Sequence, residues 1–286
     1  MTFSIRAKGV TFDFDRDPRR VLVMGVLNVT PDSFSDGALY EDPDRAYEHA
    51  CSMIAAGADI IDVGAESTRP GADPVSCEEE VRRLLPVVEA LIKNRRAVVS
   101  VDTSKAAVAD ECLSRGAHII NDVSGCRNDS DMARVVAKHA AGIILMHMRG
   151  TPSTMQQYTR YTDLIGDIIT ELRESVKRVS AAGVSAESII IDPGIGFAKT
   201  VEQNCAIIRR LREFHVFGRP VLIGPSRKSF IGKTLQRDVD ERLSGTLAAV
   251  GCAMQNGMNI VRVHDVRETS DFIAMTRAIC DEKQHV

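Results

Sequence analysis

The chain has 286 residues, 44% of them hydrophobic and 26% charged, and a formal net charge of −3. This is the composition of an ordinary globular protein, and so small a charge gives no reason to expect a nucleic-acid or anionic-membrane partner. No apolar run reaches the roughly 18 residues of a membrane span, no secretory signal is expected, and seven scattered cysteines without a CxxC pair predict reduced thiols in a cytoplasmic protein.

Short apolar runs rich in Val and Ile recur along the chain, as is typical of strands buried on both faces of a parallel sheet. They number eight and span residues 21–27, 59–64, 97–102, 118–122, 142–147, 188–192, 220–224 and 259–264. Amphipathic segments separate them. One covers 77–94 after a capping box formed by Ser76 and Glu79, and another, 163–179, carries its apolar residues at helical spacing.

Strand alternating with helix eight times predicts parallel βαβ units. We expect a single domain over residues 1–286, with an eight-stranded parallel (β/α)8 TIM barrel over 21–282 and a short N-terminal hairpin over 1–20 that caps its bottom. An open doubly wound sheet is the alternative, because periodicity cannot show that a sheet closes. Glycines stand where helices are expected to stop, at Gly57, Gly116, Gly183 and Gly257.

Every predicted strand ends in a group that can bind a polar ligand. In a (β/α)8 barrel the active site lies at the C-terminal ends of the strands, and the opposite ends carry no comparable set of residues. This asymmetry predicts an enzyme. The groups are Asn28, Asp62 with Glu66, Asp102, Asn121 with Asp122, His147, Asp192, Ser226 with Lys228, and Arg262 with His264.

Three strand ends, at Asp102, Asn121 and Asp192, supply hydrogen-bond acceptors. Such a set suits a flat heterocycle with adjacent N–H donors, and each charge-assisted bond contributes roughly 1.5–3 kcal/mol. Simpler interpretations remain open. Asp102 in "DTSK" is also a candidate helix cap, Asp122 a brace for its loop, and His147 a residue of the barrel wall.

Cations follow the seventh and eighth strands, where barrels commonly bind phosphate. Lys228, Arg262 and His264 would stabilise a departing anion there. The first loop, "NVTPDSFSDG", offers oxygen ligands of the type Mg²⁺ prefers, among them Asn28 and Asp36. The helix-face Glu and Lys residues elsewhere are most simply a solvated surface.

The chain carries, in this order, the strings "MGVLNVTPDSFSDG", "DVGAESTRPG", "VDTSK", "INDVSG", "LMHMRGTPSTMQ", "DPGIGFAKT", "GPSRKSFIG" and "RVHDV". Together they span residues 24 to 266 and resemble the dihydropteroate synthase family. The resemblance implies condensation of 6-hydroxymethyl-7,8-dihydropterin pyrophosphate with p-aminobenzoate, giving 7,8-dihydropteroate and pyrophosphate, with departure of pyrophosphate ahead of attack. It also implies Mg²⁺, a homodimer, a cytoplasmic place in folate biosynthesis, and sulfonamides as possible inhibitors.

The resemblance carries roles only onto matching residues. The pterin would be held by Asp102, Asn121, Asp192 and Lys228. The pyrophosphate would be bound by Asn28, Arg262 and His264, with Asn28 and Asp36 at the metal; these four residues and Lys228 form the expected catalytic set. The p-aminobenzoate would contact Thr68, Arg69, Pro70, Phe197, Ser226, Lys228 and Ser229.

Two residues depart from the family strings, both Ala where Gly is usual. Ala198 is expected to be tolerated, whereas Ala65 matters if the backbone there needs a positive φ. Two other functions share the pterin-binding residues: a corrinoid-dependent methyltransferase domain, which would not need "SFSDG", "STRPG" or "SRKSF", and a catalytically inactive pterin-binding protein.

Overall fold

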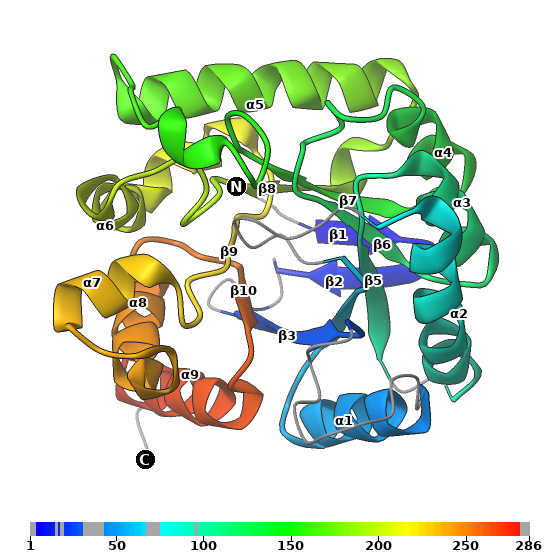
Figure 1. The fold of residues 1–286 in the computed structure, drawn as a ribbon. Helices are drawn as coiled ribbons and strands as arrows, with labels where there is room; N and C mark the ends of the chain where they lie inside the picture. Colours follow the sequence, from blue (N-terminus) through cyan, green and yellow to red (C-terminus); the bar gives the residue numbers. More distant parts are fainter. Residues whose placement is uncertain are drawn as a thin grey trace.

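The computed structural model describes residues 4–14, 17, 20–30, 43–66, 75–94 and 97–280. Within them eight parallel strands form a nearly closed barrel surrounded by helices (Figure 1). The strand order is β8-β7-β6-β5-β4-β3-β10-β9, and an isolated parallel bridge between Ile191 and Val221 joins the two ends. The (β/α)8 prediction is therefore confirmed, and the open-sheet alternative is wrong.

The barrel strands lie within two residues of the predicted runs. They are β3 (Leu22–Asn28), β4 (Ile60–Gly64), β5 (Val98–Asp102), β6 (Ile119–Asp122), β7 (Gly142–Met146), β8 (Ile189–Asp192), β9 (Leu222–Ile223) and β10 (Ile260–Val263). Neighbouring strands pair in parallel, which is the pairing that helical crossovers between strands require.

The described helices follow the strands in turn. They are α1 (Pro43–Ala55), α2 (Cys77–Lys93), α3 (Ala106–Ser114), α4 (Met132–Lys138), α5 (Leu164–Ala181), α6 (Val201–Arg209), α7 (Ser229–Leu235), α8 (Leu243–Gln255) and α9 (Val266–Cys280). Ser76 caps α2 as predicted, because its side chain accepts the N–H of Glu79. The four glycines expected at helix ends all have positive φ.

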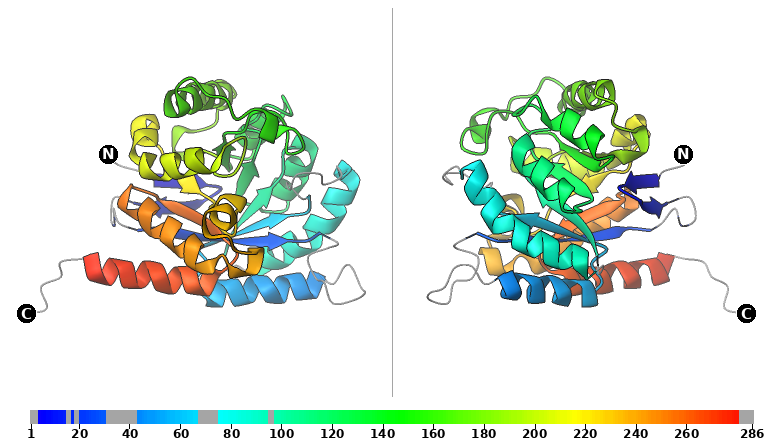
Figure 2. Two further views of the ribbon diagram at one scale, coloured as in Figure 1. Left: turned by 60° about the vertical axis from the view of Figure 1, so that its left-hand side comes forward. Right: turned by 90° about the vertical axis from the view of Figure 1, so that its right-hand side faces the viewer.

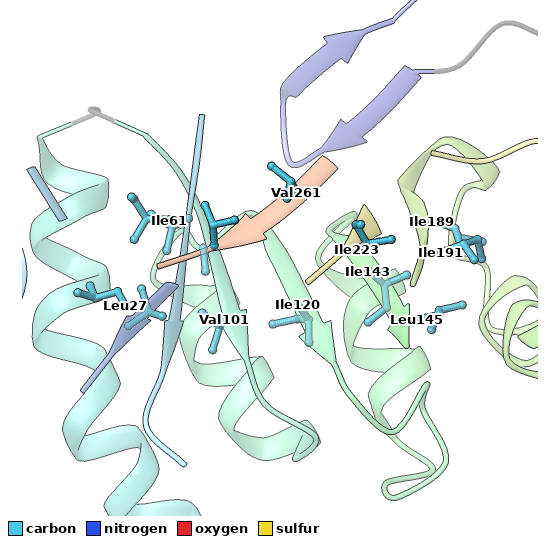
Figure 3. Close-up of a cluster of buried hydrophobic side chains, with 14 of the residues drawn as sticks. Leu27, Ile61, Val101, Ile120, Ile143, Leu145, Ile189, Ile191, Ile223 and Val261 are labelled. Atoms are coloured by element: carbon cyan, nitrogen blue, oxygen red, sulfur yellow. The ribbon is translucent and has the colours of Figure 1, made fainter. Parts of the chain in front are cut away.

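Alternate residues of each strand face opposite sides, as the strand geometry requires. One set packs against the surrounding helices, and Figure 3 shows members of it, among them Ile61, Val101 and Ile120. The other set fills the lower interior of the barrel, with Leu22, Met24, Ile60, Val98, Ile119, Ile144, Ile190, Leu222 and Ile260. The strands are apolar on both faces because both faces are buried.

An antiparallel hairpin of β1 (Ser4–Ala7) and β2 (Val10–Asp13) lies at one end of the barrel (Figure 2). Its Ile5 and Ala7, together with Phe14, belong to the same buried cluster as the lower interior residues. The hairpin is also tied to the barrel by Ser188, whose hydroxyl donates to the Arg6 carbonyl at 2.7 Å. The predicted cap is confirmed for the described residues.

The period of two also explains how the sequence aims polar groups into the barrel. Asp62, Asn121, Asp192 and Arg262 each stand two positions beyond an isoleucine of the lower interior. They therefore share that residue's inward face, one layer closer to the C-terminal ends of the strands. Asp122 is one residue out of this phase and faces away from the interior.

Candidate active site

Arg262, from β10, is held by carboxylates of two other strands. Its Nε donates to Asp62 Oδ2 at 2.6 Å, and its Nη2 donates to Asp102 Oδ2 at 2.8 Å. Asn121 Nδ2 donates to the same Asp62 oxygen at 2.9 Å. Four strands thus bring their polar residues together inside the barrel, although Asp62 was not among the residues assigned a role from the sequence.

The charges in this cluster are unequal, because carboxylates outnumber the guanidinium. Burial raises the pKa of Asp102 to about 7; Arg262 opposes the rise, and the nearby Asp62 carboxylate adds to it. Asp62 is fully buried, and its Oδ1 has no hydrogen-bond partner among the described residues. Such an uncompensated oxygen is unfavourable, so this layer of the barrel retains acceptor capacity for a ligand.

Asp192 and Lys228 form a second charged group near the ends of β8 and β9. Asp192 Oδ1 accepts the Gly194 N–H at 2.7 Å, and burial raises the pKa of its carboxyl group against the pull of Lys228. Burial lowers the pKa of Lys228 to about 8. The Lys228 ammonium donates to the Ile195 carbonyl and lies 4.5 Å from the centre of the Phe197 ring.

Ser226 and His264 form a third group, after β9 and β10. The Ser226 hydroxyl lies 3.0 Å from His264 Nδ1 and accepts the backbone N–H of His264 at 3.2 Å. This pairing orients the imidazole ring at the mouth of the barrel. Ser229 begins α7, with Lys228 as the preceding cap residue.

Asn28 ends β3 beside the acidic cluster. A Cβ built on Gly64 would lie 3.8 Å from Asn28 Oδ1 and 3.8 Å from Asp102 Oδ2, so both oxygens border the same space. Gly64 leaves that space open.

The Asn28 oxygen fits part of a magnesium site. Within the described residues, no group of three or more His, Cys, Asp and Glu side chains is arranged to hold a metal ion. Mg²⁺, however, usually keeps several waters and binds through one or two protein oxygens and a substrate phosphate. The donor chemistry therefore fits an ion shared with substrate.

Two of the simpler interpretations are resolved by contacts. Asp102 is not the cap of α3, because the N–H of Ala106 donates to Asp129 Oδ2 at 2.8 Å instead. Asp122 does brace its loop, since it accepts the N–H groups of Ser124 and Cys126. This confirms the bracing interpretation and removes Asp122 from the barrel mouth.

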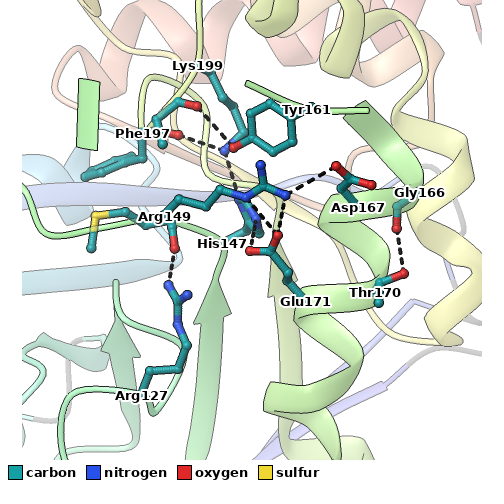
Figure 4. Close-up of polar contacts among 12 residues, drawn as sticks. Arg127, His147, Arg149, Tyr161, Gly166, Asp167, Thr170, Glu171, Phe197 and Lys199 are labelled. Carbon is teal, nitrogen blue, oxygen red and sulfur yellow. Dashed lines mark hydrogen bonds and ion pairs between the residues drawn. The ribbon is translucent and has the colours of Figure 1, made fainter. Parts of the chain in front are cut away.

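A buried network that the sequence interpretation missed adjoins Phe197 (Figure 4). His147 is a wall residue, as one interpretation held: its Nε2 lies 3.0 Å from Glu171 Oε2 and its Nδ1 lies 3.0 Å from Lys199 Nζ. Burial lowers the pKa of Lys199 to about 7 and that of His147 to about 4. The one sequence signal that could have indicated a buried Lys199 is the string "FAKT", in which the lysine follows apolar residues.

A second missed group joins the end of β4 to α2 and to the residue before α3. Lys105 Nζ donates to Glu66 Oε2 at 2.6 Å and to Glu80 Oε2 at 2.5 Å, and Glu66 Oε1 accepts the N–H of Val75. Glu80 is fully buried, so the prediction that the helix-face glutamates are solvated is wrong at this position. Its i, i+4 spacing from buried Leu84 was the available signal.

The two alanines that depart from the family strings differ in backbone conformation. Ala198 has φ +52, in the left-handed region, whereas Ala65 has no positive φ. The strained position is therefore Ala198 rather than Ala65, contrary to the expectation that Ala198 is the harmless change. Both alanines are buried.

Several predicted site residues lie outside the described residues: Asp36, Thr68, Arg69 and Pro70. The described ones fall into the clusters above, with Ser229 beside Lys228 in sequence. Asp102, Asn121 and Arg262 meet at Asp62, while Asp192, Lys228 and Phe197 meet at the end of β8.

The chain matches known proteins over nearly its whole length. A family model described as "Pterin binding enzyme" matches residues 24–264. The dihydropteroate synthase of Bacillus subtilis is 48% identical over 263 residues, 92% of this chain and 90% of the relative. The Yersinia pestis dihydropteroate synthase, solved with a sulfonamide drug complex, gives a TM-score of 0.90 at 42% identity, covering 97% of this chain and 99% of its own.

The Xanthomonas albilineans dihydropteroate synthase, solved with 4-aminobenzoic acid, gives a TM-score of 0.90 at 36% identity over 98% of this chain and 99% of its own. Among the described residues, no helix combines the length and apolar character needed to cross a membrane. Fold, motif order and near-complete coverage of the relatives agree. The chain therefore belongs to the dihydropteroate synthase family of pterin-binding enzymes, transferases of folate biosynthesis.

Proposed function

We propose that the C-terminal end of the barrel condenses 6-hydroxymethyl-7,8-dihydropterin pyrophosphate with p-aminobenzoate, through early departure of pyrophosphate. The observation that carries the proposal is the position of Arg262, an inward-facing guanidinium bound by Asp62 and Asp102 near the buried Asp192 and near Lys228. This group of residues places hydrogen-bond acceptors for a heterocycle next to cations that can stabilise a leaving anion.

The pterin ring is assigned to Asp192, Asp102, Asn121 and Lys228. A carboxylate can accept two adjacent N–H groups at once, and Asp192 is our choice for the ring amino group and its neighbouring N–H. Asn121 donates through Nδ2 to Asp62, which leaves its Oδ1 as an acceptor. Lys228 supplies a donor through its ammonium group.

Pyrophosphate is assigned to Asn28, Arg262 and His264, with Asn28 and Asp36 as protein ligands of Mg²⁺. When bound, the ion would neutralise charge that develops on the pyrophosphate. Arg262 and His264 add donors at the departing oxygen, and the His264 ring is already oriented by Ser226. Stabilisation of the leaving anion is the main electrostatic demand of the reaction.

The p-aminobenzoate ring is assigned to the side formed by Phe197, Ser226, Lys228 and Ser229, together with Thr68, Arg69 and Pro70. Phe197 packs on a small apolar cluster that contains Met146, Met148 and Met155, which favours a dry aromatic ring. In support, the Xanthomonas relative was solved with 4-aminobenzoic acid and the Yersinia relative with a sulfonamide. We expect sulfonamides to compete at this side.

In the reaction, the C–O bond to pyrophosphate breaks, and both electrons leave with the oxygen. The electron-rich dihydropterin stabilises the positive charge left on the CH₂ group. The aniline nitrogen then forms the C–N bond and releases a proton to solvent, so the site needs little general base. Exclusion of water protects the cation.

The proposal includes one catalytic domain over residues 1–286, divided into the cap at 1–20 and the barrel at 21–282. It also includes a homodimer, a cytoplasmic location, and neither nucleic-acid nor membrane partners. The support is coverage of 90% or more of two relatives named dihydropteroate synthase and the ordinary composition of the chain.

The test measures pyrophosphate release from the pterin pyrophosphate, with and without p-aminobenzoate, Mg²⁺ and a sulfonamide. We expect release that depends on p-aminobenzoate and Mg²⁺, with dihydropteroate as product and competition by the sulfonamide. Tight binding of the pterin without any release would indicate a non-catalytic pterin-binding protein instead.

A further inference from the structure

We propose that Lys199 is a positioning residue for p-aminobenzoate: through His147 and Glu171 it fixes the loop 194–198, and with it the Phe197 ring. The inference rests on the proposed function, which places Phe197 against that substrate. Lys199 itself touches neither substrate in this proposal, and it acts through the loop backbone.

The first arm of the attachment is the Lys199 side chain, which is only 4% exposed. Its Nζ donates to the Phe197 carbonyl at 2.8 Å and lies 3.0 Å from His147 Nδ1 (Figure 4). Removing an ammonium group from water costs several kcal/mol. A lysine in this place therefore has to be compensated by the backbone carbonyl and the imidazole that it joins.

The proton positions along this arm are consistent. Hydrogen bonds from His147 and Arg149 outweigh burial and lower the pKa of Glu171 to about 2, so Glu171 is a carboxylate and only accepts. His147, neutral because burial lowers its pKa to about 4, then donates from Nε2 to Glu171. Its unprotonated Nδ1 accepts from Lys199. The hydrogen bonds therefore run in one direction, from Lys199 to His147 and from His147 to Glu171 on α5.

A second arm reaches the next carbonyl of the same loop. Tyr161 Oη donates to the Ala198 carbonyl at 3.1 Å, and the Arg149 guanidinium stacks on the Tyr161 ring at 4.0 Å. Arg149 in turn donates to Glu171 Oε1 through Nε at 2.8 Å and Nη2 at 2.5 Å. Two consecutive carbonyls, of Phe197 and Ala198, are thus tied to one carboxylate.

The loop conformation shows why two attachments are useful. Gly194, Gly196 and Ala198 alternate along it with φ values of +73, +85 and +52, and the last is unfavourable for a residue with a side chain. At Gly194 the loop approaches the His147 backbone so closely that a Cβ would lie 1.9 Å from the His147 carbonyl oxygen. External contacts have to hold such a backbone in place.

The expected consequence is selective. The pterin ligands Asp102, Asn121 and Asp192 lie on strands. Asp192 and Lys228 hydrogen-bond the start of the loop, at Gly194 and Ile195, ahead of the Phe197 and Ala198 carbonyls that the two arms hold. Phe197 lies on the loop, and a misplacement of about 1 Å can cost about 100-fold in rate. Loosening the loop should therefore weaken the use of p-aminobenzoate far more than binding of the pterin ring.

The test compares Lys199→Met, Lys199→Arg and Tyr161→Phe with Lys177→Met, a control on α5 whose lysine side chain is 72% exposed and pairs only locally with Glu174. Steady-state kinetics give KM for p-aminobenzoate and kcat, and calorimetry gives Kd for 6-hydroxymethylpterin. We expect Lys199→Met to raise KM by about tenfold or more, with Kd within about twofold. Lys199→Arg should recover part of the loss.

Tyr161→Phe removes a single hydroxyl, so it tests the second arm even if Lys199→Met does not fold. We expect a rise in KM of about threefold to tenfold, as for loss of one hydrogen bond, and non-additivity in the double variant because both arms hold one loop. An unchanged KM, or equal losses in KM and pterin Kd, would overturn the inference. An inactive wild-type chain would instead overturn the proposed function.

Discussion

Asp62 and Arg262, 200 positions apart in the sequence, are joined by a 2.6 Å hydrogen bond inside the barrel. The same Asp62 oxygen accepts from Asn121, so one carboxylate sets the direction of two groups assigned to the substrate. Asp62 is therefore a residue on which the site geometry depends, although it need not contact the substrate.

Asp62→Asn should weaken the contacts to these groups, because the amide carries no charge opposite the Arg262 guanidinium and replaces one acceptor oxygen by a donor. We expect 6-hydroxymethylpterin to bind about 10-fold to 100-fold more weakly and unfolding free energy to fall by about 3–5 kcal/mol, as when a buried ion pair is broken. Asp59→Asn is the control, since Asp59 pairs with Arg20 near the start of β4 and is partly exposed. Calorimetry measures the pterin affinity of each variant, and urea unfolding measures its unfolding free energy. Unchanged pterin affinity in Asp62→Asn would contradict the assigned role.

Pterin binding should be strongest between about pH 7 and pH 8. The Asp102 carboxylate exists above its pKa of about 7, raised by burial, and is lost as pH falls below it. The Lys228 ammonium exists below its pKa of about 8, lowered by burial, and is lost as pH rises above it. A pH series of Kd for 6-hydroxymethylpterin measures this window. Asp102→Asn should change the acid limb, leaving the part due to Asp192, whose pKa burial also raises, and should leave the alkaline limb unchanged; if the acid limb does not change, Asp102 is not a titrating group.

Gly196→Ala should displace Lys228. A Cβ at Gly196 would lie 2.8 Å from Lys228 Cδ, whereas a Cβ at Gly183 would meet nothing within 4 Å, although φ is +85 and +94 respectively. Both changes carry a backbone cost of about 1–2 kcal/mol, but only Gly196→Ala should weaken pterin binding, by about tenfold. Thermal unfolding and calorimetry on the two variants separate strain from displacement. Equal pterin affinities would mean that Lys228 tolerates the added methyl group.

Ala198→Gly should be less destabilising than Ala65→Gly by about 1–2 kcal/mol. Both variants lose a buried methyl group and add unfolded-state freedom, but only position 198 relieves a left-handed alanine. Urea unfolding of the pair gives the difference directly. If Ala65→Gly proves equal or better, the φ of +52 carries no strain in solution.

The fold could be predicted because its signals are local. Strands buried on both faces need Val and Ile runs, and helix ends need glycine, as Gly57 and Gly116 show. Inward-facing site residues were also foreseeable, since a period of two carries the phase of Ile190 to Asp192. The same phase could have separated Asn121, which faces inward, from Asp122, which braces a loop.

The side-chain contacts between neighbouring units could not be predicted. Nothing near Lys199 in the sequence indicates that it meets His147, 52 residues away. Likewise, nothing near Lys105, just before α3, indicates that it meets the buried Glu80 on α2. Such pairs depend on the paths of the loops and the directions of the side chains in neighbouring units, which periodicity does not encode. The conformation of Ala198 was equally hidden, because an alanine at positive φ is chosen by its surroundings.

The borrowed cap of α3 has a consequence for how this enzyme can change. Asp129, from the following unit, accepts the Ala106 N–H. Asp102 therefore does not have to cap α3, which is the usual role of an aspartate after a strand. Natural variation at Asp102 can then alter what the barrel recognises without unravelling the helix behind it. Asp129 stabilises the start of α3 and Asp102 faces the site. Selection can therefore act on the site residue and on the capping residue separately.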